Sequence, residues 1–511
     1  MHTSPFDRRS SGILLHPSSL PGPHGIGDLG PSAHAFAEFL ARAGQRWWQM
    51  LPVGPLGGGE SPYDSPSSFA GNPLLISLDM LAQDGLLQPS DVVAPARLVN
   101  AKTCLFQTAR RFKLKRLRHA FERYSERRHE FAEDMASFRA RNASWLEGYA
   151  AFAALKRAHG GRHWQHFGPE FSHYSPGLVE RMSPELRREV ECEEFVQFVF
   201  DRQWRKLRAH CHHLGIQLLG DVPMFVSHDG ADVWQTREAF QLDHAGNRRV
   251  VAGVPPDYFS ADGQLWGNPL YDWDALRRTD FGWWVSRMAT TLSRFDAVRL
   301  DHFIGFVRYW EIPAGAHSAR EGHFVPAPGV ALFNRFREAF GSLPFLAEDL
   351  GIVTDEVHAL RDQFGLPGMK VLEFAFGGGR DYQPHRFDPR TVVYTGTHDN
   401  DTLMGWLTAY ERCEEPKERE RLLAERNRAL AYVGATDQEP NFAFIRAAMA
   451  SVANTAIFPL QDLLGQGTWA RMNVPGTSSG NWCYRCSRED LSIPVAQRLA
   501  ALTETYERLV R

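Results

Sequence analysis

The sequence predicts an α/β protein built on a closed (β/α)8 barrel, and two observations support this fold class. Short apolar runs rich in β-branched residues alternate with stretches of helical periodicity, which indicates parallel strands joined by crossover helices. These runs number eight, as in a (β/α)8 barrel. They cover residues 46–53, 74–78, 216–225, 295–303, 344–350, 369–375, 391–399 and 455–460.

The main alternative is an open, doubly wound sheet. Nucleotide-binding proteins of that class carry Gly-x-Gly-x-x-Gly after the first strand or a Gly-x-x-x-x-Gly-Lys-Ser/Thr loop. The first pattern does not follow the first predicted strand, and the second occurs nowhere in this chain. The closed barrel is therefore the preferred interpretation.

The segments between the runs are interpreted in chain order. Residues 11–30 are dense in proline and glycine, which predicts a loop with fixed turns. Residues 61–73 form a second turn-rich loop, whose hydroxyl and aromatic side chains suit the rim of a binding site. Helical periodicity predicts helices over residues 32–43, 195–214, 281–295, 329–340, 354–364 and 415–452.

Residues 82–200 have a different character from the rest of the chain. They are charged, and their aromatic residues recur at helical spacing without a sustained heptad. We expect one catalytic barrel over residues 1–511, with an inserted helical subdomain at roughly 82–200 after the second strand. A second insertion is expected at roughly 228–280, after the third strand.

Composition and charge exclude several classes of partner. The net charge is −3, so no basic field is available to hold nucleic acid or an anionic membrane. The N-terminus lacks the apolar core of a signal peptide, and no run approaches the about 18 apolar residues of a membrane span. We expect a cytoplasmic protein with no nucleic-acid or membrane partner, either a monomer or a homodimer.

Two groups of residues have the spacing of metal or redox sites. Cys483 and Cys486 form a C-x-x-C pair, but no second pair exists, and the six cysteines are expected to be reduced. His210 and His213 share a helix face, where histidines also complement the helix C-terminus, and that role is favoured. No metal or cofactor is expected.

A third observation concerns the acidic residues. Carboxylates end four of the predicted strands, which is where a (β/α)8 barrel has its active site. These residues are Asp221, Asp301, Glu348 and Asp399. Core strands rarely end in carboxylates by chance, so we expect the four side chains to converge on one cleft.

Two of these acids are predicted to differ in charge. Arg299 and Asp301 lie on the same face of an extended strand, so the guanidinium should lower the pKa of Asp301 and make it a candidate nucleophile. Read alone, the pair could also be a structural ion pair. Glu348 follows an apolar run that offers no fixed cation, so burial should raise its pKa and keep it protonated. Asp349 is adjacent and could compete for that role. An ionised nucleophile beside a protonated acid is the arrangement that a retaining glycosidase needs.

Several motifs together resemble the α-amylase superfamily, and most closely its 4-α-glucanotransferases, the amylomaltase or disproportionating-enzyme family. The resemblance extends over about residues 11–485 in the family's order. The motifs that carry it are Ser18–Pro21, Gly25–Gly30, Trp48–Pro52, Ser61–Pro73, Gly220–Pro223, Gly253–Ser260, Trp266–Tyr271, Arg299–Phe303, Ala347–Gly351, Thr397–Thr402 and Arg471–Thr477. One departure is Tyr484, where the family usually has tryptophan.

The resemblance implies a role for each matching catalytic residue. Asp301 would be the nucleophile that forms a covalent glucosyl-enzyme. Glu348 would protonate the leaving sugar and then deprotonate the incoming one. Asp399 would stabilise the transition state by holding ring hydroxyls. The implied substrate-binding residues are Arg299, His398, Asp221, Ser61, Tyr63, Trp266 and Asn268.

The resemblance also implies the reaction. A covalent intermediate can be resolved by water or by a sugar hydroxyl, and the family decides for transfer of α-1,4-glucan segments to glucose or another glucan. The implied partners are maltooligosaccharides, α-1,4-glucan and glucose as acceptor, with no metal. No β-sandwich of the kind that follows the barrel in α-amylases is expected. The alternatives are an α-1,4-glucan hydrolase of the α-amylase type and a non-catalytic glucan-binding protein.

Overall fold

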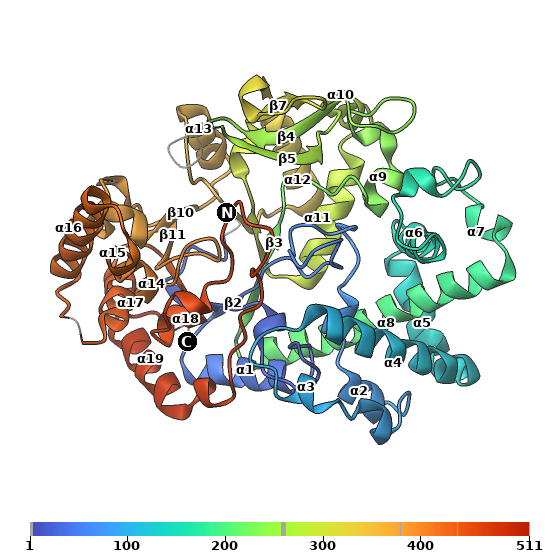
Figure 1. Cartoon of the computed structure of the whole chain (residues 1–511), viewed down its shortest axis with the longest axis horizontal. Helices are drawn as coiled ribbons and strands as arrows, with labels where there is room; N and C mark the ends of the chain where they lie inside the picture. The colour runs from blue at the N-terminus through green and yellow to red at the C-terminus, as the bar shows by residue number, and fades with distance from the viewer. Residues whose placement is uncertain (1–3, 257–261, 379, 437, 510–511) are drawn as a thin grey trace.

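Eight parallel strands close into a barrel at the centre of the molecule, as predicted (Figure 1). The computed structural model describes residues 4–256, 262–378, 380–436 and 438–509. Following the barrel round, its strands are β1 (Ser10–Leu14), β2 (Trp47–Gln49), β3 (Gln217–Val222), β6 (Ala297–Leu300), β9 (Phe345–Ala347), β10 (Gly368–Val371), β11 (Thr391–Tyr394) and β12 (Thr455–Pro459).

The first strand was wrongly assigned from the sequence. It is β1, which lies at the edge of the predicted 11–30 loop, and it pairs with both β12 and β2. The strand begins with Ser-Ser-Gly, which is not an apolar pattern, although all five of its residues are buried. A Cβ at Gly12 would lie 2.3 Å from the Cβ of Trp47, so glycine lets β2 approach.

The predicted strand at 74–78 is also wrong, because that apolar run is helical. Asn72 accepts a hydrogen bond from Leu74 N at the start of a 3₁₀ turn, and Ser77 caps α2 (Leu78–Gln83). The run is apolar because α4 (Phe106–Glu126) and α8 (Pro184–His213) cover it. A short buried helix and a buried strand share this pattern, so periodicity alone could not separate them.

Longer helices surround the barrel, close to the predicted positions. They are α1 (Pro31–Arg42), α8, α11 (Gly282–Arg294), α12 (Gly329–Phe340), α13 (Asp355–Gln363), α16 (Pro416–Val433), α17 (Pro440–Ala450) and α19 (Ile493–Thr505). The predicted helices over 415–452 are α16 and α17, which are separated because Gly434 ends α16 in the left-handed conformation and Pro440 opens α17. Within the part of the chain described, no helix is long and apolar enough to cross a membrane.

Between β2 and β3 the chain builds a group of helices on one side of the barrel, at the right of Figure 1. Its longer members are α4, α5 (Ala132–Arg141), α6 (Leu146–Ala158) and the first half of α8. The aromatic residues of α4 pack against α8, as Tyr124 does on Phe195 with ring centroids 4.7 Å apart. The helix α8 then continues to the barrel, where Trp204 packs edge-on against Phe295.

A four-stranded antiparallel sheet, absent from the sequence prediction, lies beside the barrel at the top of Figure 1. Its strands are β4 (Val250–Val254), β5 (Gln264–Pro269), β7 (Arg308–Pro313) and β8 (His323–Pro326), in the order β5-β4-β7-β8. The sheet joins the segments that follow β3 and β6. It thereby places Trp266 and Asn268, both on β5, near the mouth of the barrel.

Short helices complete the described chain. They are α3 (Ala96–Val99), α7 (Leu178–Arg181), α9 (Ala231–Gln235), α10 (Trp273–Arg278), α14 (Leu403–Leu407), α15 (Ala409–Arg412) and α18 (Leu460–Leu463).

Arg508 anchors the C-terminal end of the described chain to the bottom of the barrel. The side chain is fully buried, and its guanidinium donates to the carbonyls of Ser10, Met449, Ala453 and Asn454, each at 2.9 Å. Burial lowers the pKa of Arg508 to about 9, well below the usual value for arginine. The residue therefore donates hydrogen bonds to the buried backbone of two segments, the start of β1 and residues 449–454.

We expect Arg508→Met to lower the free energy of unfolding by about 3 kcal/mol or more, because several buried carbonyls lose their donor. Urea denaturation followed by circular dichroism measures this. Arg42→Met is the control, since Arg42 forms an exposed ion pair with Glu38 at the surface, and it should change stability by about 0.5 kcal/mol or less. Equal midpoints for the two variants would contradict the anchoring role.

Candidate active site

A cleft of about 590 Å³ opens at the carboxyl ends of the barrel strands. Nine of the ten predicted site residues line it: Ser61, Tyr63, Trp266, Asn268, Arg299, Asp301, Glu348, His398 and Asp399. The tenth, Asp221, lies beneath the floor of the cleft and bonds to Tyr63 and Arg299. The structure therefore brings all ten residues to one place.

Arg299 is the hub of the charged residues. In the parallel pairing of β3 and β6 it stands opposite Asp221, and its Nη1 contacts Asp221 Oδ1 and Oδ2 at 2.9 and 2.7 Å. Its Nη2 lies 2.9 Å from Asp301 Oδ1. Burial works against the charge, but the carboxylates of Asp221 and Asp301 raise the pKa of Arg299 well above its usual value. Arg299 is thus a permanent cation beside Asp301.

Asp221 supports this cation from below. Its carboxylate is buried, and burial raises the pKa of Asp221 while the Arg299 guanidinium opposes that rise. Tyr63 donates its hydroxyl to Asp221 Oδ2 at 2.9 Å. Asp221 therefore orients Arg299 and Tyr63 without itself lining the cleft.

Glu348 is held by the backbone of the turn that follows β6 and carries Asp301. His302 N donates to Glu348 Oε2 at 2.6 Å, and His302 adopts a left-handed conformation with φ of 49°. That conformation is unusual for histidine and turns the amide toward the acid. The contact fixes Glu348 relative to Asp301.

Burial is the largest cause that raises the pKa of Glu348, to about 8, as the sequence predicted in direction. The apolar run before Glu348 offers no cation, but Arg299 Nη2 lies 4.0 Å from Glu348 Oε2 and opposes the rise. That cation comes from the neighbouring strand, so the apolar run before Glu348 could not reveal it. The raised pKa favours the protonated form of Glu348 at neutral pH.

Asp349 does not compete with Glu348 for the role of acid. Its carboxylate is buried outside the cleft, where it bonds to Arg361 Nη1 at 2.6 Å and to Met369 N at 2.7 Å. Both partners belong to the following α/β unit. Asp349 therefore ties β9 to β10.

The carboxyl groups of Asp301 and Glu348 both lie near Arg299 Nη2. Asp301 Oδ1 and Glu348 Oε2 lie 2.9 and 4.0 Å from the same nitrogen of Arg299. Their separation therefore cannot exceed the sum of these distances. Retaining glycosidases place their two carboxyl groups about 5–5.5 Å apart, and the arrangement is compatible with that spacing.

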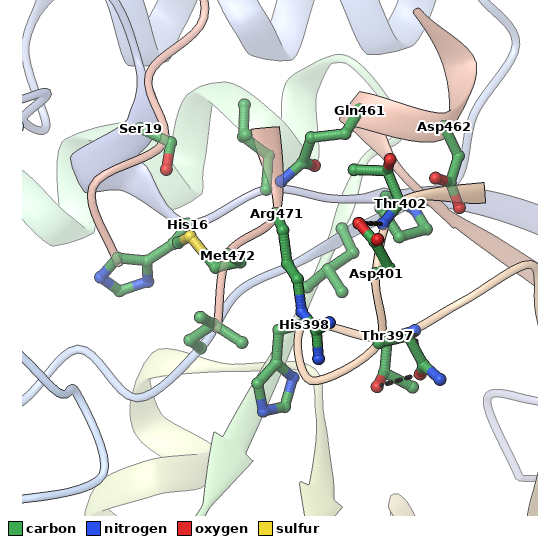
Figure 2. A pocket seen from close by; sticks show the side chains of 15 residues that line it. His16, Ser19, Thr397, His398, Asp401, Thr402, Gln461, Asp462, Arg471 and Met472 are labelled. Carbon is green, nitrogen blue, oxygen red and sulfur yellow. Dashed lines mark hydrogen bonds between the residues drawn. The ribbon is translucent and has the colours of Figure 1, made fainter. Parts of the chain in front are cut away.

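Asp399 lies on the loop that follows β11. His398 Nε2 is 3.3 Å from Asp399 Oδ2, and Asn473 Nδ2 donates to Asp399 Oδ1 at 2.6 Å. The Asp399 side chain is 47% exposed and lines the cleft. A smaller pocket beside the cleft is also lined by His398, together with other residues of this loop, which Figure 2 shows.

Aromatic rings line both sides of the cleft. Tyr63 stacks on His398 with ring centroids 5.2 Å apart, and Trp482 lies 5.8 Å from Tyr63. On the other side Trp266 packs edge-on against His302 at 5.0 Å and is 39% exposed. Such faces suit sugar rings, which present apolar C–H groups.

Two of the predicted binding residues have structural contacts as well. Ser61 Oγ accepts from Tyr63 N at 3.3 Å, which shapes the turn of the 61–73 loop. Asn268 Nδ2 donates to Val226 O at 2.9 Å, which ties β5 to the segment after β3.

Other residues that line the cleft have no role predicted from the sequence, among them His302, Asn473 and Trp482. His302 and Asn473 belong to the family motifs Arg299–Phe303 and Arg471–Thr477, but a motif does not indicate which contacts its residues make across the barrel mouth. Trp482, like His302, has a positive φ, at 65°. Of the Gly253–Ser260 motif, residues 257–260 lie outside the described residues.

The sequence candidates for metal or redox sites have other surroundings. Within the described ranges, no group of three or more His, Cys, Asp or Glu side chains is placed to hold a metal ion. His210 packs its ring against His34, with centroids 4.8 Å apart. Cys483 and Cys486 are free thiols, and Cys483 Sγ lies 3.6 Å from Glu60 Oε2.

Comparisons with known proteins place this geometry among glucan-transferring enzymes. The sequence model described as 4-alpha-glucanotransferase matches residues 15–491. A 4-alpha-glucanotransferase of Thermus thermophilus is 47% identical over 98% of this chain and 99% of its own length. A second, from Synechocystis, is 43% identical over 99% of each chain.

Solved structures agree with these matches. Amylomaltase from Streptococcus agalactiae, in complex with acarbose, superposes with a TM-score of 0.90 at 34% identity, covering 98% of this chain and 100% of that one. Amylomaltase from Corynebacterium glutamicum gives 0.79 at 20% identity, covering 98% and 75%, which supports the fold alone.

Proposed function

Because this chain belongs to the 4-alpha-glucanotransferase family, we propose that Asp301, Glu348 and Asp399 carry out its reaction. The enzyme is a 4-α-glucanotransferase that transglycosylates α-1,4-glucans. The observation that carries the assignment is the meeting of Asp301 and Glu348 on Arg299, with one carboxylate paired to the guanidinium and the pKa of the other raised.

In the first step, Asp301 attacks the anomeric carbon of the donor glucan as the glycosidic bond breaks. Glu348 gives its proton to the departing oxygen, so the leaving sugar keeps a neutral 4-hydroxyl. Arg299 stays paired with the Asp301 carboxylate until the new ester bond forms. Asp399 binds ring hydroxyls and stabilises the developing positive charge.

In the second step, the 4-hydroxyl of glucose or of another glucan attacks the same carbon. Glu348, now ionised, takes the proton of that hydroxyl, and the Asp301 ester bond breaks. Two inversions leave the α-configuration unchanged. The aromatic faces of Tyr63, Trp482 and Trp266 hold sugars at the cleft, and an acceptor held there competes with water for the intermediate.

Incubation with maltotriose tests the proposed function. We expect glucose together with maltooligosaccharides longer than the substrate, separated by chromatography, because one donor segment is transferred to another maltotriose. Shortened products without longer ones would identify the hydrolase alternative, and an unchanged substrate would contradict both transfer and hydrolysis.

We further propose a cytoplasmic location. All six cysteines lie in the described part of the chain and are free, as is usual in a reducing compartment. Non-reducing electrophoresis of freshly isolated protein tests this, because any native disulfide would contradict it.

A further inference from the structure

We propose that Asn473 is a positioning residue for the transfer reaction, whose side-chain amide holds the Asp399 carboxylate in the orientation that meets the sugar. The inference rests on the proposed role of Asp399. It adds a residue that lies 74 positions further along the chain.

The contact between the two side chains is short and direct. Asn473 Nδ2 donates to Asp399 Oδ1 at 2.6 Å. A carboxylate accepts hydrogen bonds and cannot donate them, so it also determines which end of the amide faces it. Hydrogen bonds to ionised acceptors are shorter and stronger than those between neutral groups. Asn473 therefore favours one rotamer of the Asp399 carboxylate.

The loop that carries Asp399 provides little support of its own. The strand β11 ends at Tyr394, and Asp399 lies five residues beyond it. Its backbone N–H makes only a long contact of 3.3 Å with Thr397 Oγ1. Thr397 in turn bonds to Asn400 Oδ1 through both N and Oγ1, at 2.9 and 2.8 Å, so these contacts shape the turn rather than the Asp399 side chain.

Asn473 is itself fixed to this loop from the other side. Its N–H donates to His398 O at 3.0 Å. Arg471 Nε donates to Asn473 O at 2.8 Å, and Arg471 Nη2 donates to Asp399 O at 2.7 Å. Figure 2 shows the Arg471 side chain running alongside the loop of His398, Thr397, Asp401 and Thr402. The segment 471–473 therefore holds the backbone of Asp399 as well as its carboxylate.

The chemical identity of residue 473 suits this task. An arginine would neutralise the carboxylate, whereas an amide orients it and leaves its charge available to the sugar. His398 Nε2 lies near the second oxygen at 3.3 Å. With one neighbour on each oxygen, Asp399 keeps lone pairs directed into the cleft for two adjacent ring hydroxyls. Misplacement of such a group by about 1 Å can cost roughly 10²-fold in rate.

The test replaces the amide in two ways. Asn473→Ala should lower kcat by about 10²-fold at every pH, because Asp399 loses its donor. Asn473→Asp places a second carboxyl beside Asp399, and two such groups share one proton when the pH is low enough. That shared proton restores the hydrogen bond. The ratio of the kcat of Asn473→Asp to that of the parent should therefore rise as the pH falls from 8 to 5.

Asn481→Asp is the matched control. Its amide contacts Val474 and Thr477, and no carboxylate among the described residues, so its ratio to the parent should not change with pH. A flat ratio for Asn473→Asp, or a parental kcat in Asn473→Ala, would overturn the inference. Thermal unfolding of each variant separates these results from loss of fold.

Asp399→Ala distinguishes failure of the inference from failure of the proposed function. If this variant keeps parental activity, the role of Asp399 is wrong. If it is inactive and Asn473→Ala behaves as the parent, only the role of Asn473 is wrong.

Discussion

Asp301→Asn is expected to lower transfer between maltooligosaccharides by on the order of 10⁴-fold or more, as when an enzyme loses its nucleophile. The amide keeps the shape of the side chain but cannot form the ester to the anomeric carbon. Asp301 is partly exposed, with 27% of its side chain accessible, so the fold should survive the change. The measurement is initial rate with maltotriose, beside thermal unfolding of the same preparation.

The smaller variant Asp301→Gly gives a second result that depends on the nucleophile alone. With α-glucosyl fluoride and azide, azide can occupy the vacated space, attack the anomeric carbon once and displace fluoride. One displacement inverts the configuration, so we expect β-glucosyl azide. Formation of the α-azide would show that another residue still supplies the first displacement.

Glu348→Gln is expected to lower transfer from maltooligosaccharides by about 10²–10⁴-fold, the usual contribution of a positioned acid. Transfer from α-glucosyl fluoride should suffer less in the first step, because fluoride leaves without a proton. Because the pKa of Glu348 is raised to about 8, its proton is present below that pH and is lost above it. The parent kcat/KM should therefore fall as the pH rises through about 8.

This basic limb should be absent from the kcat/KM profile of Glu348→Gln. If the limb remains at the same pH in the variant, it belongs to another group. Azide offers a matched comparison with the nucleophile variant. It can replace the acceptor in Glu348→Ala after Asp301 has formed the ester, so two displacements should give α-glucosyl azide, opposite to the product of Asp301→Gly.

The architecture could be predicted because barrel strands are buried on both faces and read as continuous apolar runs. The four acids stood out because a carboxylate at the end of such a run is unfavourable without a function. The apolar run 74–78 was wrongly predicted to be a strand, because buried helical turns are as apolar as buried strands. The sequence does not reveal Ser10–Leu14 as a strand, because the run begins with two serines and Gly12 rather than β-branched residues, and the close approach of Trp47 requires the glycine.

The parts of the site that escaped prediction depend on contacts between distant segments. The cation facing Glu348 comes from the neighbouring strand, and the donor to Asp399 comes from Asn473. In the antiparallel sheet, β4 and β5 come before β6 in the chain, and β7 and β8 come after it. The pairing of β4 with β7 therefore joins distant segments, which a local hairpin pattern cannot indicate. Local patterns record burial and turns, whereas these contacts follow from closure of the barrel.

The covalent glucosyl-enzyme on Asp301 is the central claim, and mass spectrometry of Glu348→Gln tests it most directly. With α-glucosyl fluoride the ester should form without the acid and persist, because the base that activates the acceptor is missing. After rapid acid quench and digestion, we predict that the peptide containing Asp301 gains the mass of one glucosyl unit. The double variant Asp301→Asn/Glu348→Gln should remain unlabelled. A glucosyl group on any other residue, or turnover of the fluoride to an inverted product, would contradict the account.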